Sequence, residues 1–385
     1  MIYFSAVGML NALGNSLDEI AANLLRGQAP GMRPSSDWLT GGRRCWIGHV
    51  DGELPSLPAE LAVHNSRNNR LLLAALAQIR GEVDHAIARF GAGRVAVILA
   101  TSTAGVDEAD QFVSGSEQGY HYAQQELGDP SRFLAAYLGL SGPAYTLSTA
   151  CSSSARAIIS GQRLIAAGLA DVAIVGGADT LSRMPVNGFD SLESLSADRC
   201  APFSAQRDGI SIGEGAALML LTREPQAVAL LGVGESSDAY HMSAPHPQGE
   251  GAKRAITMAL KDAGLQPDAL GYINLHGTAT RLNDQVEAQV IDQIFAEQVP
   301  CSSTKHLTGH TLGAAGICEA ALCWLLLTRD LPLPPQDFSA GERDNSLPRC
   351  GLITVPQALK KPLILSNSFA FGGNNACLIL GVPHG

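Results

Sequence analysis

The chain has 385 residues and a mass of 40.2 kDa, and only 16% of its residues are charged, where an average soluble domain has about 25%. Its net charge of −10 argues against nucleic-acid binding. High apolar content without a heptad or Gly-X-Y period excludes coiled coil, collagen and disorder. Either a second subunit covers part of this weakly charged surface, or small residues, 41 glycines among them, pack unusually closely.

The sequence predicts a cytoplasmic protein. Its densest apolar run, Ala321–Leu327, is far shorter than the roughly 18 residues that a membrane span needs. The opening M-I-Y-F-S-A-V-G-M-L has no basic region and is typical of a strand, not of a signal peptide. The eight cysteines form no C-x-x-C pair, which favours reduced thiols in a cytosol.

Strand-like and helix-like segments alternate along the chain. Six apolar runs predict strands: Val95–Ala100, Asp171–Gly176, Ala216–Thr222, Val228–Val233, Ala269–Leu275 and Leu363–Ser366. Helical patterns between them include Gly251–Ala263 and Asp284–Glu297, and in the second Asp284 and Glu287 have the spacing of a capping box. This alternation predicts an α/β fold whose sheet is buried on both faces.

A weak internal repeat suggests two related halves. Ile2–Gly27 and Val228–Gly264 both run from a strand through a glycine-containing turn into a helix. The halves would join near Thr222–Val228, but this pattern alone leaves the number of domains open.

Cys151 is the first candidate functional residue. The predicted strand Ala144–Leu147 leads into T-A-C-S-S-S-A, a turn and then a helix of small residues. The unpaired N–H groups and dipole at a helix N-terminus favour a thiolate there. Most cysteines are buried and inert, as we expect of the other seven, so this setting alone names no chemistry.

His276 and a second polar segment are further candidates. His276 ends a predicted buried strand before a glycine turn, where α/β sheets often place functional groups, although a single histidine is more often structural. In S-S-T-K-H-L-T-G-H, Ser302 and Lys305 fit the S-x-x-K pattern of serine acylases, but the other acylase motifs are missing. His306 and His310 have metal-ligand spacing without the usual Glu, so we favour a third interpretation, in which Lys305 and His310 face a shared pocket.

The segment S-N-S-F-A-F-G-G-N-N predicts a turn between two strands. One interpretation is a plain hairpin. The other is a functional turn that offers a backbone N–H, with Phe369 and Phe371 acting as gates.

Taken together in this order, the motifs make the chain similar to the β-ketoacyl-acyl-carrier-protein synthases of the thiolase superfamily. The resemblance runs nearly end to end and also includes A-P-F-S-A-Q-R-D-G-I-S-I-G-E-G-A-A, H-G-T-A-T-x-x-N-D-x-x-E and K-x-x-x-G-H-x-x-G-A-A-G. Two histidine motifs make it resemble the elongating Cys-His-His class, whose accessory members occur in bacterial polyketide and aryl polyene clusters.

The resemblance implies a role for each site residue. Cys151 would carry the acyl chain, its N–H and that of Phe371 would form the oxyanion hole, and His276 and His310 would hold the malonyl thioester during decarboxylation. The remaining expected site residues are the supporting Lys305 and Glu319, the acids Asp284 and Glu287 near the histidine loop, Thr278 and Thr280 for the phosphopantetheine arm, and the carrier-docking Arg67 and Arg70. No metal and no dissociable cofactor would be needed.

The resemblance also implies a fold and partners. The fold would be a five-layered α-β-α-β-α architecture of two related halves, which we place at residues 1–225 (with the nucleophile) and 226–385 (with both histidines). The partners would be an acyl carrier protein and a second subunit, identical or related. The alternative function is a chain-length-factor-like partner subunit with little catalysis of its own.

Overall fold

The computed structural model describes residues 1–116 and 119–383. Its main sheet consists of two sets of five strands. In spatial order from the shared centre, the first set is β1 (Ile2–Leu10), β8 (Gly215–Thr222), β6 (Val172–Asp179), β4 (Val95–Ala100) and β5 (Ala144–Leu147). The second set is β9 (Val228–Ser237), β13 (Asn374–Gly381), β12 (Leu363–Phe369), β10 (Tyr272–Asn274) and β11 (Cys301–Ser302).

The two sets repeat one topology. In both, the first three strands pair antiparallel and the last three pair parallel. Antiparallel pairing of β1 with β9, from Ile2↔Leu230 to Phe4↔Val228, joins the sets into one ten-stranded sheet. The prediction of two related halves is therefore confirmed, whereas the boundary between residues 225 and 226 stays a prediction.

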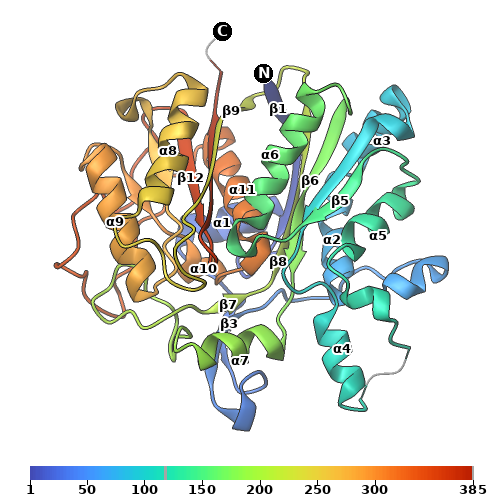
Figure 1. The fold of residues 1–385 in the computed structure, drawn as a ribbon, viewed down its shortest axis with the longest axis horizontal. Helices are drawn as coiled ribbons and strands as arrows, with labels where there is room; N and C mark the ends of the chain where they lie inside the picture. The colour runs from blue at the N-terminus through green and yellow to red at the C-terminus, as the bar shows by residue number, and fades with distance from the viewer. Residues whose placement is uncertain (117–118, 384–385) are drawn as a thin grey trace.

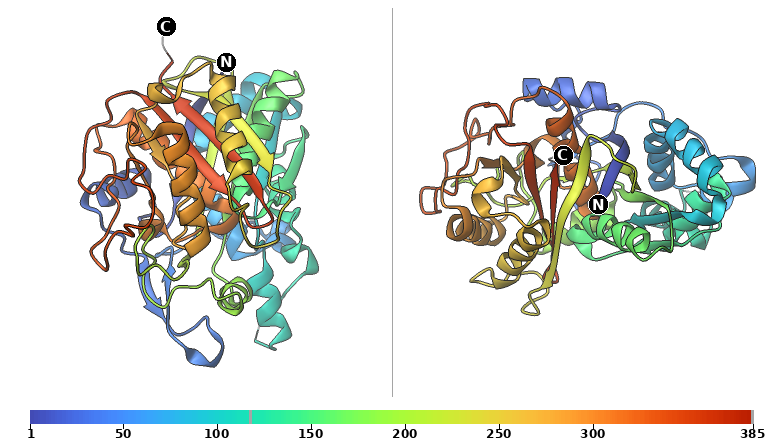
Figure 2. Two further views of the ribbon diagram at one scale, coloured as in Figure 1. Left: turned by 60° about the vertical axis from the view of Figure 1, so that its left-hand side comes forward. Right: turned by 90° about the horizontal axis from the view of Figure 1, so that it is seen from above.

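Helices form three layers around the two halves of the sheet (Figures 1 and 2). Helices α2 (Arg67–Ala77), α3 (Arg80–Phe90) and α5 (Asp129–Leu138) cover the outside of the first half. Helices α8 (Glu250–Ala263) and α9 (Arg281–Phe295) cover the outside of the second half. Between the halves lie α6 (Ser153–Ala166) and α11 (Ala315–Thr328), which share the largest core. This arrangement is the predicted five-layered α/β fold.

Small residues allow the central layer to be thin. A Cβ atom on Gly316 of α11 would lie 2.6 Å from the backbone nitrogen of Ala155 in α6. A Cβ atom on Gly161 of α6 would lie 2.5 Å from a side-chain carbon of Val175 in β6. These close approaches explain part of the high glycine content.

The other elements gather mostly at one end of the sheet, where α7, α4 and the hairpin of β2 and β3 lie at the bottom of Figure 1. They are α1 (Leu17–Arg26), β2 (Met32–Ser35), β3 (Cys45–Gly48), α4 (Val106–Val113), α7 (Arg183–Ser191), β7 (Ile212–Gly213) and α10 (Lys305–Thr308). Short 3₁₀ helices span Thr40–Gly42, Ala59–His64, Ala92–Arg94, Tyr122–Gln125, Ala150–Ser152, Pro267–Ala269 and Leu312–Ala314. Within residues 1–116 and 119–383, no helix is both long and apolar enough to cross a bilayer.

Two local predictions need correction. The apolar run Ala269–Leu275 forms a strand only over Tyr272–Asn274, because its first residue belongs to a 3₁₀ turn. The helix predicted to start at Asp284 begins earlier, at Arg281, with Thr280 as its N-cap. Asp284 and Glu287 are therefore not a capping box.

Candidate active site

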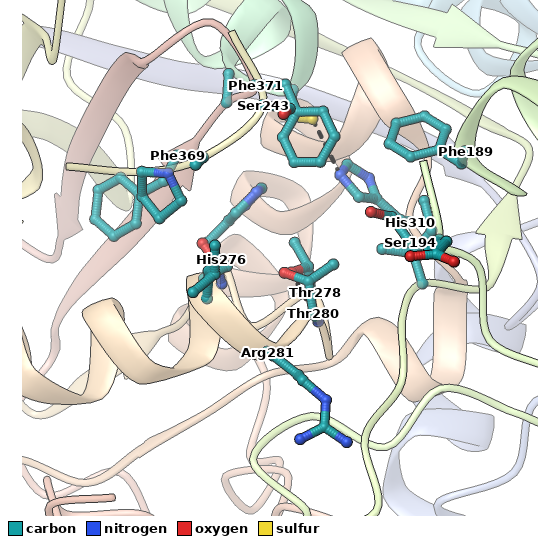
Figure 3. Close-up of a pocket in the computed structure, with 18 of the residues that line it drawn as sticks. Phe189, Ser194, Ser243, His276, Thr278, Thr280, Arg281, His310, Phe369 and Phe371 are labelled. Carbon is teal, nitrogen blue, oxygen red and sulfur yellow. Dashed lines mark hydrogen bonds between the residues drawn. The ribbon is translucent and has the colours of Figure 1, made fainter. Parts of the chain in front are cut away.

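Three separate segments bring one cysteine and two histidines together. Cys151 lies in the 3₁₀ turn before α6, His276 follows β10, and His310 follows α10. The Sγ atom of Cys151 and one ring nitrogen of each histidine all lie within 4.8 Å of one another. The three residues line a cavity of about 420 Å³, shown in Figure 3. Both halves of the fold thus contribute residues to one cavity.

His310 carries its proton on the nitrogen that faces Cys151. The backbone N–H of Leu312 donates to His310 Nδ1 at 3.1 Å, so Nδ1 must be the acceptor. The proton then lies on Nε2, which is 3.1 Å from Cys151 Sγ. Burial, together with the positive charge of Lys305, lowers the pKa of His310 well below its usual value. The ring is therefore a neutral N–H donor at pH 7.

His276 has the same tautomer for a different reason. The Lys305 ammonium, which can only donate, lies 3.3 Å from His276 Nδ1 and also bonds to the His276 carbonyl at 2.6 Å. The proton of the neutral ring is therefore on Nε2, which is buried and has no hydrogen-bond partner within the described part of the chain. Burial and the charge of Lys305 lower the pKa of His276 well below its usual value.

A buried ion pair fixes Lys305. Its ammonium lies 2.6 Å from Glu319 Oε1, and both side chains are almost fully enclosed. Burial raises the pKa of Glu319, and the charge of Lys305 opposes that effect. Ser302, the other residue of the acylase pattern, donates instead to the carbonyl of Pro334. Of the three interpretations, the shared pocket holds for His310, which lines the cavity, whereas Lys305 lies behind His276 and does not line it.

Two convergent N–H donors suit an anion better than a metal ion. A metal would need the lone pair of each Nε2, but the donors facing both Nδ1 atoms keep the protons on Nε2. His306, the other histidine with metal-ligand spacing, lines a different cavity beside Arg199 and Asp337. The pair His306 and His310 therefore does not form one site.

Cys151 differs from the expectation of a resting thiolate. Complete burial raises the pKa of its thiol to about 11, although the N–H groups of Phe371 and Cys151 and the charge of Lys305 act in the opposite direction. Desolvation thus outweighs the favourable position before α6. Those same two N–H groups are the ones expected to form an oxyanion hole.

The two phenylalanines line the same cavity as the histidines. Phe369 ends β12, and its ring centroid is 6.1 Å from that of His276. Phe371 lies in the following turn, with its ring centroid 5.4 Å from that of Phe189 in α7. Phe189, which the sequence analysis missed, lines the cavity with both of them (Figure 3).

The acids and threonines after His276 hold its loop. Glu287 accepts the backbone N–H groups of His276 and Gly277 at 2.8 and 2.7 Å. Asp284 accepts the N–H of Phe203 at 2.9 Å. Burial raises the pKa of Glu287 to about 7 and also raises that of Asp284. Both acids thus lie behind the loop, whereas Thr278 and Thr280 line the cavity with their hydroxyls 2.8 Å apart.

Arg67 and Arg70 lie at the start of α2, but their guanidinium groups have partners within the protein. Arg67 bonds to both carboxylate oxygens of the fully buried Glu214, at 2.6 and 3.0 Å. Arg70 bonds to the carbonyls of Leu54 and Pro55. Their role in carrier docking stays a prediction.

Asp179 is a site residue that sequence reasoning missed. It ends the fully buried strand β6, and its carboxylate accepts the N–H groups of Ser102 and Thr103 at 2.8 Å. Its other oxygen accepts the N–H of Ala314 at 3.2 Å, from the turn that follows His310. Asp179 therefore ties the first half of the fold to the His310 segment. Its signal in the sequence is an acid at the end of an entirely apolar strand.

Comparison with known proteins identifies the family. The model described as "Beta-ketoacyl synthase, N-terminal domain" matches residues 46–227, and "Beta-ketoacyl synthase, C-terminal domain" matches residues 228–337. A "3-oxoacyl-[acyl-carrier-protein] synthase 2" of Synechocystis is 30% identical over 98% of this chain and 97% of that protein. The chain therefore belongs to the β-ketoacyl synthase family.

Solved structures with the same fold include complexes of two subunits. One, titled "Ketosynthase (ApeO) in Complex with its Chain Length Factor (ApeC) from Xenorhabdus doucetiae", has a chain 68% identical to this one, with a TM-score of 0.98 and coverage of 99% of this chain and 98% of that one. A chain of "The ishigamide ketosynthase/chain length factor" is 27% identical, with a TM-score of 0.86 and coverage of 100% and 99%.

Proposed function

We propose that this protein catalyses the decarboxylative Claisen condensation of malonyl-acyl carrier protein with an acyl chain on Cys151. The product is a β-ketoacyl-acyl carrier protein, in chain elongation of the fatty-acid or polyketide type, aryl polyenes included. The observation that carries this proposal is the pair of Nε2–H donors from His276 and His310, which converge beside Cys151 Sγ. The reaction named for the Synechocystis relative supports it.

The first step transfers the acyl chain. Cys151 attacks the carrier thioester, and the proton that its thiol loses ends on the departing phosphopantetheine thiol. With a pKa of about 11, about one thiol in ten thousand is ionised at pH 7. Catalysis of this step then depends on the N–H groups of Phe371 and Cys151, which stabilise the tetrahedral oxyanion.

The second step releases carbon dioxide. As the carboxylate carbon of malonate leaves, its bonding electrons move toward the thioester carbonyl and place negative charge on that oxygen. Two N–H donors fixed on this oxygen stabilise the charge more strongly in the transition state than in the substrate. The enolate carbon then attacks the acyl thioester and a C–C bond forms. The sulfur of Cys151 leaves as a thiolate, which takes up one proton from water to restore the resting thiol.

Lys305 serves the second step as a positioning residue. Its ammonium keeps the proton of His276 on Nε2, because it occupies Nδ1 as a donor. The bond to Glu319 holds the ammonium in place. Thr278 and Thr280 line the path of the phosphopantetheine arm and offer hydroxyls to its amides.

The alternative is a partner subunit that sets chain length within a two-chain synthase. The Xenorhabdus complex contains a ketosynthase and its chain length factor, and one of its chains is similar to this one. The alternative is therefore the role of the chain length factor in such a complex. The retained Cys151, His276, His310 and Lys305 favour catalysis, because a purely structural subunit needs none of them.

The deciding experiment compares Cys151→Ala and Cys151→Gln variants with the wild type, alone and beside any co-purifying synthase. We expect the wild type to form an acyl adduct on Cys151, detected by mass spectrometry, and both variants to lose condensation. Full condensation by a complex containing either variant would assign this chain to the partner role instead.

A further inference from the structure

The turn that follows His310 has a strained backbone and sets the protonation of the His310 ring. Leu312 has a φ of 55°, in the left-handed region that a leucine rarely adopts. The backbone N–H of the same residue donates to His310 Nδ1 at 3.1 Å. That bond leaves the ring proton on Nε2, which faces Cys151 Sγ (Figure 3). A group that holds this turn in place therefore controls the donor that His310 offers.

Asp179 holds the turn from the other half of the fold. Its Oδ2 atom accepts the N–H of Ala314 at 3.2 Å, and the carbonyl of Thr311 accepts the same N–H at 3.0 Å. Gly313 lies directly against the carboxylate, because a Cβ atom there would be only 2.7 Å from Oδ2. Asp179 thus contacts both residues that follow the strained Leu312.

The carboxylate is itself fixed by the segment after β4. Its Oδ1 atom accepts the hydroxyls of Thr101 and Thr103 at 2.9 and 2.6 Å, and the N–H groups of Ser102 and Thr103 at 2.8 Å each. The side chain of Asp179 is completely buried. Because four donors hold one oxygen, the other oxygen is a rigid acceptor for the N–H of Ala314.

We infer that Asp179 is a positioning residue for His310, an inference that rests on the proposed function. It is not among the residues that line the cavity, so it acts through His310. By holding the two residues after it, the carboxylate keeps Leu312 in its strained conformation, with its N–H on Nδ1. Without that support the turn relaxes and the ring proton is shared between both nitrogens. The donor beside Cys151 is then lost in part of the molecules.

The variant Asp179→Asn should break one side of this contact and keep the other. An amide has one acceptor oxygen and one donor NH₂ group. Four donors face Oδ1 and one faces Oδ2, so the amide oxygen takes the Oδ1 side and the NH₂ group points at the N–H of Ala314. Two donors then oppose each other at the turn, whereas residues 101–103 keep their acceptor.

The first readout is the tautomer of His310, which a merely structural role of Asp179 would not change. In protein labelled with ¹⁵N-histidine, protonated and unprotonated ring nitrogens differ in chemical shift, and the spectrum of His310→Asn assigns the signals. We expect the Nε2–H form in the wild type and a mixture of both tautomers in Asp179→Asn.

The second readout is kinetic. Complete loss of one oxyanion donor slows a reaction by about 10²–10³, and here the donor is lost in only part of the molecules, so kcat for decarboxylation of malonyl-acyl carrier protein should fall by about three- to tenfold. The KM should stay within about twofold, because the donor acts mainly in the transition state.

Asp129→Asn is the matched control. Asp129 is another buried aspartate of the first half, but it lies in the outer helix α5, and its carboxylate bonds to His64 and Asn69. The same substitution there should lower the melting temperature and leave the His310 signals and kcat unchanged. An equal change of the His310 signals in this control would overturn the positioning role, because any loss of stability would then have the same effect.

Gly313→Ala reaches the same turn by a different route. It keeps the carboxylate but adds a methyl group between the turn and Asp179. We expect the same mixture of His310 tautomers and the same fall in kcat as in Asp179→Asn. Should Asp179→Asn not fold, Gly313→Ala decides the outcome with the same two readouts.

The positioning role and the proposed function fail separately. If the wild type does not decarboxylate or condense malonyl thioesters, the proposed function is wrong, and the ¹⁵N spectra still test the role of Asp179. If the wild type is active but the variants at positions 179 and 313 keep its His310 tautomer, the positioning role is wrong. A wild type without the Nε2–H form, or a fall in kcat with an unchanged tautomer, would overturn it as well.

Discussion

Replacing Lys305 by methionine should have two effects that can be measured separately, a lower stability of the fold and a slower decarboxylation. Methionine fills a similar volume but removes the ammonium that bonds to Glu319 and to both His276 Nδ1 and its carbonyl oxygen. Glu319 would then be a buried carboxylate without a counter-charge. Removing one partner of a buried ion pair costs about 3–5 kcal/mol.

This loss should be visible as a lower melting temperature. An unfolding entropy of about 2.1 cal/mol/K per residue gives about 0.8 kcal/mol/K for the 385 residues, so Tm should fall by about 4–6 °C. The deficit should be larger at pH 8 than at pH 5.5. Burial already raises the pKa of Glu319, and without Lys305 it rises further. An acid whose folded pKa is raised keeps its stability at low pH and loses it as the pH rises.

The chemical effect should fall mainly on the decarboxylation step. Without the ammonium, the ring of His276 can carry its proton on Nδ1, and the enolate oxygen then loses one donor. Loss of one such donor reduces the rate by about 10²–10³. We expect malonyl decarboxylation, followed by release of labelled carbon dioxide, to fall by this factor, while acylation of Cys151 changes much less.

A double variant tests the reasoning. Lys305→Met/Glu319→Gln removes the unpaired charge, so it should regain most of the lost Tm but none of the lost decarboxylation. Recovery of decarboxylation together with Tm, or equal losses of acylation and decarboxylation in Lys305→Met, would refute the tautomer argument.

Three further predictions follow from the same contacts. His276→Asn should impair decarboxylation and spare acylation of Cys151, whereas His310→Asn should impair both steps, because of the two histidines only His310 bonds to Sγ. Equal losses of the two steps in both variants, measured in single-turnover assays, would contradict this. Alkylation of Cys151 by iodoacetamide should rise about tenfold per pH unit between pH 7 and 9, as a thiol with a pKa of about 11 requires; a flat rate above pH 7 would mean that the thiolate is already formed. Gly316→Ala should lower the unfolding free energy by about 1–3 kcal/mol, since its Cβ would meet the backbone of α6, whereas Gly81→Ala in α3, with open space around it, should be neutral or stabilising in the same urea titration.

Sequence patterns predicted the parts of this fold that local rules determine. Val95–Ala100 is a buried strand because its residues are apolar throughout, and it forms as expected. Asp284 and Glu287 have the spacing of a helix cap, but their carboxylates instead bind the N–H groups of Phe203 and His276. The spacing of two acids in the sequence does not show which backbone N–H groups, far away in the chain, their carboxylates will bind in the folded protein.

The same limit applies to the charges of the site. The position of Cys151 before α6 favours a thiolate, but the degree of burial, which only the assembled halves determine, dominates its pKa. Arg67 as a carrier-docking contact stays a prediction, but its pairing with Glu214, which is 147 residues away in sequence, could not be predicted from local patterns. Phe189 and Asp179 reach the site only because the first half folds against the second.

The low charge of the chain leads to one more expectation. The exposed surface of 14493 Å² is close to the roughly 14,000 Å² that a monomer of this mass has, so the few charges are spread over an ordinary area. Close packing of α6 on α11 explains part of the glycine content. It does not explain the large apolar side chains that are exposed at the surface. Four of these lie on α4 and the segments after it, which contact one another: Phe112, Val113, Tyr122 and Leu127.

A second subunit, identical or related, should cover this patch. Sedimentation equilibrium at micromolar concentration should give about twice the mass of 40.2 kDa for a homodimer, and co-expression with a related chain should give a heterodimer. Val113→Glu places a charge on the most exposed of the four side chains and should weaken association at least tenfold. Leu169→Glu, an exposed position after α6 outside the patch, should not. A wild type that remains monomeric both alone and with a related chain would mean that the low charge reflects internal packing only.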